Sequence, residues 1–177
     1  MSKVLLLPGW MTALKFYGDN NGLDIQIGKL KENYTQADCV IGISLSALVV
    51  LRDINRINGK VILINPPLPK RNILIWFARW VRFITADGLF FERQKFTKNP
   101  IKLILTLVDC LKLLKTDFSA VLKNLPKERI TVIRGKGDKY FCDDKAADFI
   151  RSIGIELIEV DSGHNWSELV EKSLKNT

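Results

Sequence analysis

The chain has few of the side chains that hold metals or cross-links. It contains one histidine, and its three cysteines, Cys39, Cys110 and Cys142, have no C-x-x-C spacing. A structural zinc site needs about four clustered His or Cys ligands, so we expect no metal and no other cofactor. An odd number of scattered cysteines is typical of reduced thiols, which predicts a cytoplasmic protein.

Long apolar runs are absent as well. No run approaches the roughly 20 residues that a membrane-spanning helix needs. The opening SKVLLLPGW has one lysine and four consecutive aliphatic residues, which does not fit a secretory signal. With 177 residues and 47% hydrophobic composition, we expect one globular domain with a substantial core.

Acidic side chains are scarce in the middle of the chain. Residues 68–127 hold 12 Lys and Arg but 4 Asp and Glu, whereas the remainder holds 15 of each, so this segment carries the whole net charge of +8. Such a surface could meet nucleic acid, an anionic membrane or an acidic protein. Nucleic acid is disfavoured, because the aromatic residues lie in apolar helical runs rather than among glycines and basic residues.

Strand and helix patterns alternate outside this segment, which predicts an α/β fold with a doubly wound, mainly parallel sheet. Short β-branched runs indicate six strands buried on both faces. We expect the strands at Val4–Leu7, Asp24–Ile27, Cys39–Ile43, Val61–Ile64, Ile130–Ile133 and Ile155–Val160. Helical patterns cover Ile27–Tyr34, Ser46–Ile57, Asp143–Ile153 and Trp166–Leu174.

The basic segment is predicted to be a helical lid inserted after the fourth strand. Its stretches NILIWFARWVRFITAD and IKLILTLVDCLKLLK have apolar and amphipathic helical patterns. We therefore predict a core of residues 1–67 and 128–177 and a lid of residues 68–127. An insertion at that point lies over the carboxyl edge of the sheet, where open α/β folds bind ligands.

The stretch VIGISLSALVVL places Gly42 and Ser44 between a predicted strand and a predicted helix. The pattern G-x-S-x-G at such a turn is a nucleophile elbow, which holds the serine above the edge of the sheet. Here Ser46 stands in place of the second glycine. Taken alone, the stretch fits a serine that merely caps the helix at least as well.

Two more strand ends favour a catalytic interpretation. Asp138 follows the strand RITVIR through G-K-G, and His164 follows the strand IELIEV. A serine nucleophile needs a base, and a histidine base needs a carboxylate to orient it. We therefore expect Ser44 Oγ within hydrogen-bond reach of His164 Nε2, with Asp138 as the acid. Asp143 and Asp144 look instead like residues at a helix start.

The first predicted strand ends in P-G-W and supplies a candidate oxyanion hole. Backbone N–H groups must point at the developing alkoxide, and one comes from the residue after the nucleophile, Leu45. Trp10 is the expected second donor, with Met11 in reserve. The alternative is that Pro-Gly is only a turn and Trp10 is a core residue, and both interpretations can hold together.

Together P-G-W, G-I-S-L-S, G-K-G-D and G-H-N-W resemble the α/β-hydrolase family over the chain outside the lid. The resemblance implies a Ser44–His164–Asp138 triad, hydrolysis of a carboxylic ester or thioester, and the strand order 2-1-3-4-5-6. Pro8 stands where many members have His, and Ser46 where most have Gly. The P-G-W loop is also similar to that of methyl esterases that act on pimeloyl-carrier protein in biotin synthesis.

The composition of the lid indicates how a substrate or partner could be bound. Arg79, Arg82 and Arg93 lie among its apolar residues, which indicates an acyl tunnel with a basic mouth, or a surface for an acidic carrier protein or an anionic membrane. The alternative is a packed cap with solvated basic residues. For the protein as a whole, the alternative is a non-catalytic binding protein on a hydrolase scaffold, with the lid as its interface.

Overall fold

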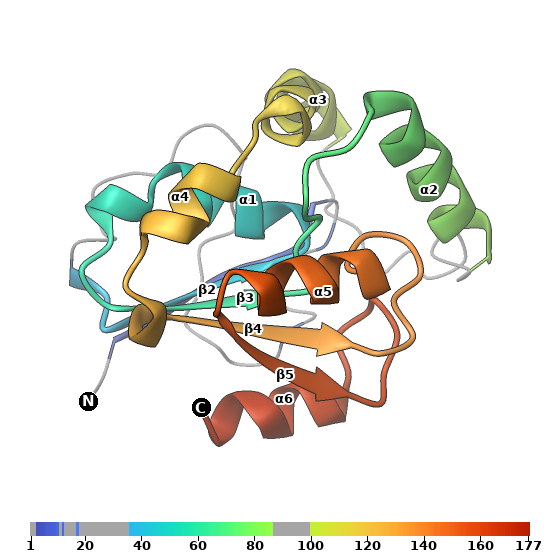
Figure 1. The fold of residues 1–177 in the computed structure, drawn as a ribbon. Coiled ribbons are helices and arrows are strands. Elements are labelled where there is room, and N and C mark those ends of the chain that lie inside the picture. Colours follow the sequence, from blue (N-terminus) through green and yellow to red (C-terminus); the bar gives the residue numbers. More distant parts are fainter. Residues whose placement is uncertain (1–2, 11, 13–16, 18–35, 87–99) are drawn as a thin grey trace.

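The structure, a computed structural model, describes residues 3–10, 12, 17, 36–86 and 100–177, with the side chains of residues 100–105 left aside. Five parallel strands form one sheet in the order β1-β2-β3-β4-β5 (Figure 1). They are β1 (Val4–Leu7), β2 (Cys39–Ile43), β3 (Lys60–Ile64), β4 (Ile130–Gly135) and β5 (Glu156–Val160). The α/β class and the parallel sheet are confirmed. The strand predicted at Asp24–Ile27 and the helix at Ile27–Tyr34 lie outside the described residues, so the six-stranded order stays a prediction.

The central strands are apolar because both of their faces are covered. In β3, Val61 and Leu63 pack into a core with α1 (Leu45–Arg52), α4 (Ser119–Asn124) and α5 (Asp144–Ser152). Ile62 and Ile64 face the opposite side, where α6 (Glu168–Lys175) packs (Figure 1). A strand buried on both faces has no alternation of polar and apolar residues, so it forms a continuous apolar run. This is why these strands could be predicted from the sequence.

Two predicted helix boundaries shift. The helix predicted to reach Ile57 ends at Arg52, and the chain continues in the short 3-10 helix η3 (Ile54–Arg56). The last helix begins at Glu168 rather than at Trp166, because the Ser167 side chain accepts a hydrogen bond from the Val170 N–H and caps it. A second 3-10 turn, η6 (Lys127–Arg129), leads into β4.

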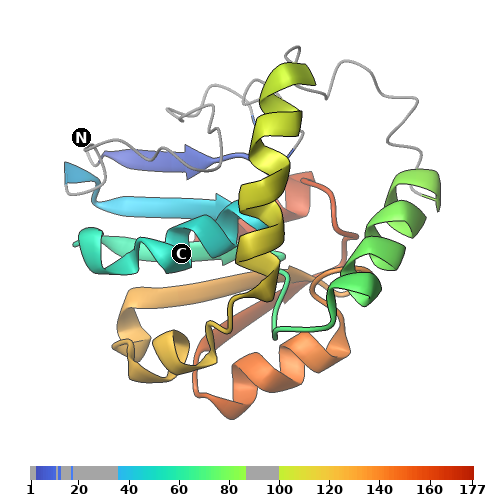
Figure 2. The same cartoon turned by 90° about the horizontal axis from the view of Figure 1, so that it is seen from above.

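Helices α2 (Ile73–Ala86) and α3 (Pro100–Lys115) lie at the end of the sheet toward which the strands run (Figure 2). Helix α4 belongs to the same inserted segment, yet its Leu122 is fully buried in the main core. The described part of residues 68–127 therefore both packs on the sheet and extends over its carboxyl edge. We keep the name lid for residues 68–127, and the division into core and lid remains an interpretation.

None of the helices in the described ranges combines the length and apolar character that crossing a bilayer requires.

Candidate active site

Ser44 occupies a sharp turn between β2 and α1. Its backbone has φ 52° and ψ −123°, and its N–H donates to the carbonyl of Ile64 at 2.8 Å. A non-glycine residue with positive φ costs on the order of 1–3 kcal/mol, and such residues gather at active sites. The Ser44 side chain makes no capping hydrogen bond to α1. The simple N-cap interpretation therefore does not describe what this hydroxyl does.

Gly42 and Ser46, the small residues on either side of Ser44, serve different purposes. A Cβ on Gly42 would lie 2.8 Å from Ala47 Cα, so only glycine lets β2 and α1 approach this closely. Ser46 is buried, and its hydroxyl donates to the carbonyl oxygen of Pro8. The departure from glycine at position 46 thus ties the turn to the loop after β1.

The structure brings Ser44, His164 and Asp138 together in one hydrogen-bonded chain. Ser44 Oγ lies 2.9 Å from His164 Nε2, and His164 Nδ1 lies 2.6 Å from Asp138 Oδ2. The three residues follow β2, β5 and β4, whose carboxyl ends meet at one edge of the sheet. The contact predicted between Ser44 and His164 is therefore present.

The Asp138 carboxylate is fully enclosed and well supplied with donors. Oδ1 accepts the N–H groups of Tyr140 at 2.9 Å and Phe141 at 3.0 Å, and Oδ2 accepts that of Cys142 at 3.0 Å. Burial by itself raises the pKa of Asp138, but the charge and hydrogen bond of His164 and these N–H groups outweigh it, so the pKa is lowered. Asp138 is therefore an acceptor that can stabilise a protonated imidazole.

The His164 ring is held by aromatic neighbours. The ring of Phe141, the residue after Tyr140, lies 4.6 Å from the His164 ring between centroids, and the ring of Phe83 on α2 lies edge-on to it at 4.9 Å. With 7% of its surface exposed, His164 is shielded from water on its lid side. The lid helix α2 thus forms part of the wall around the base.

Asn65 is a buried residue at the end of β3 that sequence reasoning missed. Its Nδ2 donates to the carbonyl of His164 at 2.9 Å, and its Oδ1 accepts the Gly135 N–H at 2.8 Å. Its φ is 46°, a conformation that asparagine tolerates better than most residues. A Cβ on Gly135 would lie 2.1 Å from the Gly163 carbonyl, so the two loops joined by Asn65 are in close contact. The only sequence signal was a polar residue directly after an apolar strand, in I-N-P-P.

The two residues predicted to supply the oxyanion donors, Leu45 and Trp10, line the same cavity as Ser44. Leu45 is the first residue of α1, so its N–H has no acceptor within the helix, and Trp10 lies in the loop after β1. The Gly9 N–H in that loop is already occupied by Tyr17 Oη at 3.1 Å. Trp10 also reaches the lid, since its Nε1 donates to Thr106 Oγ1 at 3.0 Å. Met11 lies outside the described residues.

A cavity between the sheet edge and the lid opens at these residues. Ser44, Leu45, Trp10 and His164 are among the residues that line it. The rest of its wall is largely apolar and aromatic, and includes Trp76, Phe77, Trp80 and Phe83 of α2 and Leu107 and Leu111 of α3. None of the described lining residues carries a charged carboxylate, ammonium or guanidinium group.

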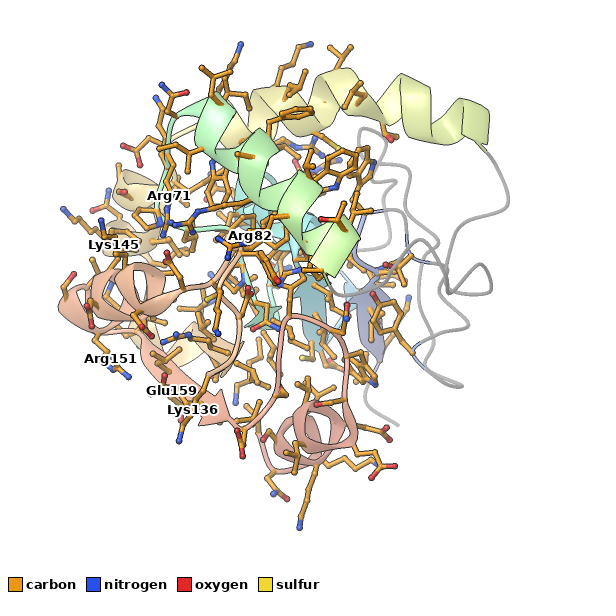
Figure 3. The ribbon with its side chains drawn as sticks, turned by 90° about the vertical axis from the view of Figure 1, so that its right-hand side faces the viewer. Arg71, Arg82, Lys136, Lys145, Arg151 and Glu159 are labelled. Atoms are coloured by element: carbon orange, nitrogen blue, oxygen red, sulfur yellow. The ribbon has the colours of Figure 1, made fainter. Side chains whose placement is uncertain are left out.

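Of the predicted substrate-binding arginines, Arg79 and Arg82 are not in this wall. Arg79 is paired with Asp143 at 2.8 Å and donates to the carbonyl of Tyr140 at 3.1 Å. Arg82 is exposed on α2 (Figure 3), and Arg93 lies outside the described residues. Arg79 faces the loop before α5 because it lies three residues after the buried Trp76, on the inward side of α2. The expected basic mouth is therefore not formed by Arg79 or Arg82.

In the described ranges, the cavity offers few side chains that could bind a metal ion or act as a second nucleophile. No group of three or more His, Cys, Asp or Glu side chains there could hold a metal ion. Cys39, Cys110 and Cys142 are unpaired. Cys110 lines the cavity, but burial raises the pKa of its thiol, so it is not a competing nucleophile at neutral pH.

Comparison with solved structures shows that the chain has the α/β-hydrolase fold. It is similar to an α/β hydrolase from a Medee basin deep-sea metagenome library, with 16% identity and a TM-score of 0.61, covering 98% of this chain and 86% of the other. The enol-lactonase from Burkholderia xenovorans LB400 has 15% identity and a TM-score of 0.59, over 99% of this chain and 89% of its own. The thioesterase domain from the curacin biosynthetic pathway has 12% identity and a TM-score of 0.53, over 99% and 91%. No protein-family model and no curated protein matches the sequence.

Proposed function

We propose that the protein is a serine hydrolase that cleaves a carboxylic ester or thioester. The observation that carries the proposal is the chain of contacts from Ser44 Oγ to His164 Nε2 at 2.9 Å and from His164 Nδ1 to Asp138 Oδ2 at 2.6 Å. This is the order of nucleophile, base and orienting acid that acyl transfer requires. The similar structures include an enol-lactonase and a thioesterase domain, which supports the same reaction class.

In the proposed mechanism, Ser44 Oγ attacks the acyl carbonyl while His164 Nε2 takes the hydroxyl proton. The N–H groups of Leu45 and Trp10 hold the oxyanion that forms. His164 then gives its proton to the departing alcohol or thiol, which leaves an acyl-Ser44 ester. Water, deprotonated by His164, releases the carboxylic acid and restores the serine. Asp138 keeps Nδ1 protonated throughout, and no cofactor takes part.

The cavity supports an apolar acyl group as substrate. Its described lining has aromatic and aliphatic side chains around Ser44 and no charged group, so burying an ionised substrate there would be costly. An ester linked to a carrier protein, as the P-G-W resemblance implies, fits within this class. The unpaired cysteines support the predicted cytoplasmic location.

A fluorophosphonate probe tests the proposal, because it reacts with activated serines without needing the natural substrate. We expect the wild-type chain to be labelled on Ser44, and Ser44→Ala to abolish labelling with little change in melting temperature. Ser46→Ala is the matched control, and its label should still be found on Ser44. A folded wild-type chain that is neither labelled nor able to hydrolyse esters would favour the non-catalytic binding protein instead.

A further inference from the structure

In the described part of the chain, most of the exposed large hydrophobic side chains lie on the lid. Eight large hydrophobic residues are exposed within the described ranges, and seven of them lie on α2 and α3. Single exposed hydrophobic residues are ordinary, but a group on two neighbouring helices marks an interaction surface. We call these seven residues the lid face: Leu74, Ile75, Phe77, Val81, Leu107, Val108 and Leu111.

Helix α2 is apolar on two opposite sides. Trp76 and Phe83 point inward and pack with Phe141. Leu74 and Val81, which also lie seven residues apart, point outward and are 72% and 40% exposed. A helix that only covered the site would carry polar residues on that outer side. Within the described residues, this outward apolar ridge is left exposed.

The lid face is continuous with the cavity. Phe77, Leu107 and Leu111 are 61%, 44% and 39% exposed, yet all three also line the cavity that contains Ser44. Helices α2 and α3 both lie toward the carboxyl end of the strands (Figure 2), and residues of both helices line the cavity. An acyl chain could pass from an apolar phase outside to Ser44 along apolar side chains only.

Positive charge accompanies this apolar surface. Lys115 is exposed seven residues after Val108, so it projects from the same side of α3, and Lys112 is exposed one turn earlier. Arg82 is exposed on α2 (Figure 3). An apolar centre with cations beside it is the pattern of proteins that lie in the interface of anionic membranes. The same charges oppose the pairing of two copies through this face, because two basic lids repel each other.

The geometry points to a docking function: the lid face sits on an anionic lipid bilayer and admits an acyl ester from it into the cavity. Leu74, Val81 and Val108 enter the edge of the hydrocarbon, while Arg82, Lys112 and Lys115 remain among the anionic headgroups. The choice of substrate rests on the proposed hydrolase activity, whereas the docking itself does not require catalysis.

Vesicle sedimentation with the full chain carrying Ser44→Ala tests docking separately from hydrolysis. The vesicles contain phosphatidylcholine alone, or phosphatidylcholine and phosphatidylglycerol in equal parts. We expect binding to the mixed vesicles, weaker binding to the neutral ones, and a loss of the difference as salt shortens the Debye length to well below about 10 Å. Adding Leu74→Gln and Val81→Gln should weaken binding by about tenfold or more, since two aliphatic side chains no longer leave water.

Leu169→Gln is the matched control, because Leu169 is 46% exposed but lies on α6, on the opposite face of the sheet. It should bind vesicles like the parent chain. Equal vesicle binding by the Leu74/Val81 double variant, or no binding to the mixed vesicles, would overturn the docking proposal. So would a chain that ignores vesicles but binds an acidic acyl-carrier protein, or that dimerises through residues 74 and 81.

Turnover of a small soluble ester separates the two proposals. With Ser44 present, the Leu74/Val81 double variant should hydrolyse such an ester at close to the wild-type rate, since neither side chain lines the cavity. Vesicle binding without any ester hydrolysis would end the proposed function and leave docking in place. Ester hydrolysis without vesicle binding would overturn the docking proposal and leave the proposed function in place.

Discussion

Arg79 of α2 and Asp143, which caps α5, form an ion pair at 2.8 Å that joins the lid to the loop of Asp138. The same guanidinium donates to the carbonyl of Tyr140 at 3.1 Å, and the Tyr140 N–H donates to Asp138 Oδ1 at 2.9 Å. Arg71 also binds the Asp143 carboxylate, with 2.8 Å between Nη1 and Oδ2. This part of α2 is therefore fixed to the site rather than free to swing away.

Asp143→Asn should destabilise the protein in a pH-dependent way. Burial raises the pKa of Asp143, but Arg71 and Arg79 outweigh it, so its pKa lies well below the usual value. A lowered folded-state pKa gives stability that is complete above the unfolded pKa of about 3.9 and is lost as pH falls through the folded value. At neutral pH we expect the variant to lose about 1–3 kcal/mol of unfolding free energy.

Urea unfolding of both proteins measures this difference, which should shrink steadily as the pH is lowered below about 4. Asp148→Asn is the control on the same helix, because its contact with Arg151 is 3.4 Å long and exposed. That control should change stability by less than about 0.5 kcal/mol. A constant difference between wild type and Asp143→Asn at all pH values would show that the ion pairs are not the cause.

Asp138→Asn should lower kcat on a small ester by about 10⁴-fold, because an amide favours the wrong tautomer of His164. It should also disturb the loop, since an amide NH₂ cannot accept the backbone N–H groups that Asp138 holds. Asp144→Asn is the comparison, and its carboxylate is 94% exposed beside Arg134. Its kcat should stay within about twofold of wild type. If Asp144→Asn were the damaging change, Asp138 would not be the acid.

Asn65→Gly should slow catalysis through the position of His164. Glycine accepts the φ of 46°, so the variant removes the hydrogen bonds to His164 and Gly135 without backbone strain. We expect kcat to fall by about tenfold or more, with KM little changed, and stability to fall by about 1–3 kcal/mol. Asn65→Ala should lose more stability because alanine is strained at this φ. An unchanged kcat in both variants would mean that Asn65 is only structural.

Ser46→Ala should weaken the oxyanion hole. The variant removes the hydrogen bond from the Ser46 hydroxyl to the Pro8 carbonyl, which holds the loop that carries the Trp10 N–H. If the Trp10 N–H is displaced, it stabilises the oxyanion of the transition state less well, whereas binding of the uncharged ester hardly changes. We therefore expect kcat to fall by about tenfold while KM stays nearly constant. Steady-state kinetics on a soluble ester measures the split. A rise in KM at constant kcat would instead place Ser46 in substrate binding.

Gly42→Ala should destabilise the fold by about 1–3 kcal/mol, because its Cβ would lie 2.8 Å from both Ala47 Cα and Val50 Cγ2. Gly163→Ala is the matched control at another turn of the site, where a Cβ would meet nothing within 4 Å. Its unfolding free energy should change by less than about 0.5 kcal/mol. Equal losses in thermal unfolding of the two variants would show that close packing of β2 and α1 is not the reason for Gly42.

The strands and the three strand-end residues were predictable from the sequence because local pattern and topology carry them. Strands buried on both faces are continuous apolar runs, and parallel strands bring their carboxyl ends to one edge. The serine after β2, the aspartate after β4 and the histidine after β5 must therefore lie near one another. The same reasoning selected Asp138 over Asp143, which the structure shows as the N-cap of α5.

The sequence by itself thus determined the α/β class, the edge at which Ser44, Asp138 and His164 meet, and the basic character of the lid. Only the tertiary structure decided that Asn65 holds the His164 loop, that Ser46 bonds to Pro8, and that Arg79 is bound to Asp143 rather than facing the cavity. These contacts join residues 38 to 99 positions apart. Hydrophobic periodicity reports only which side of one element is buried, whereas the partner of a buried polar group depends on how separate elements pack.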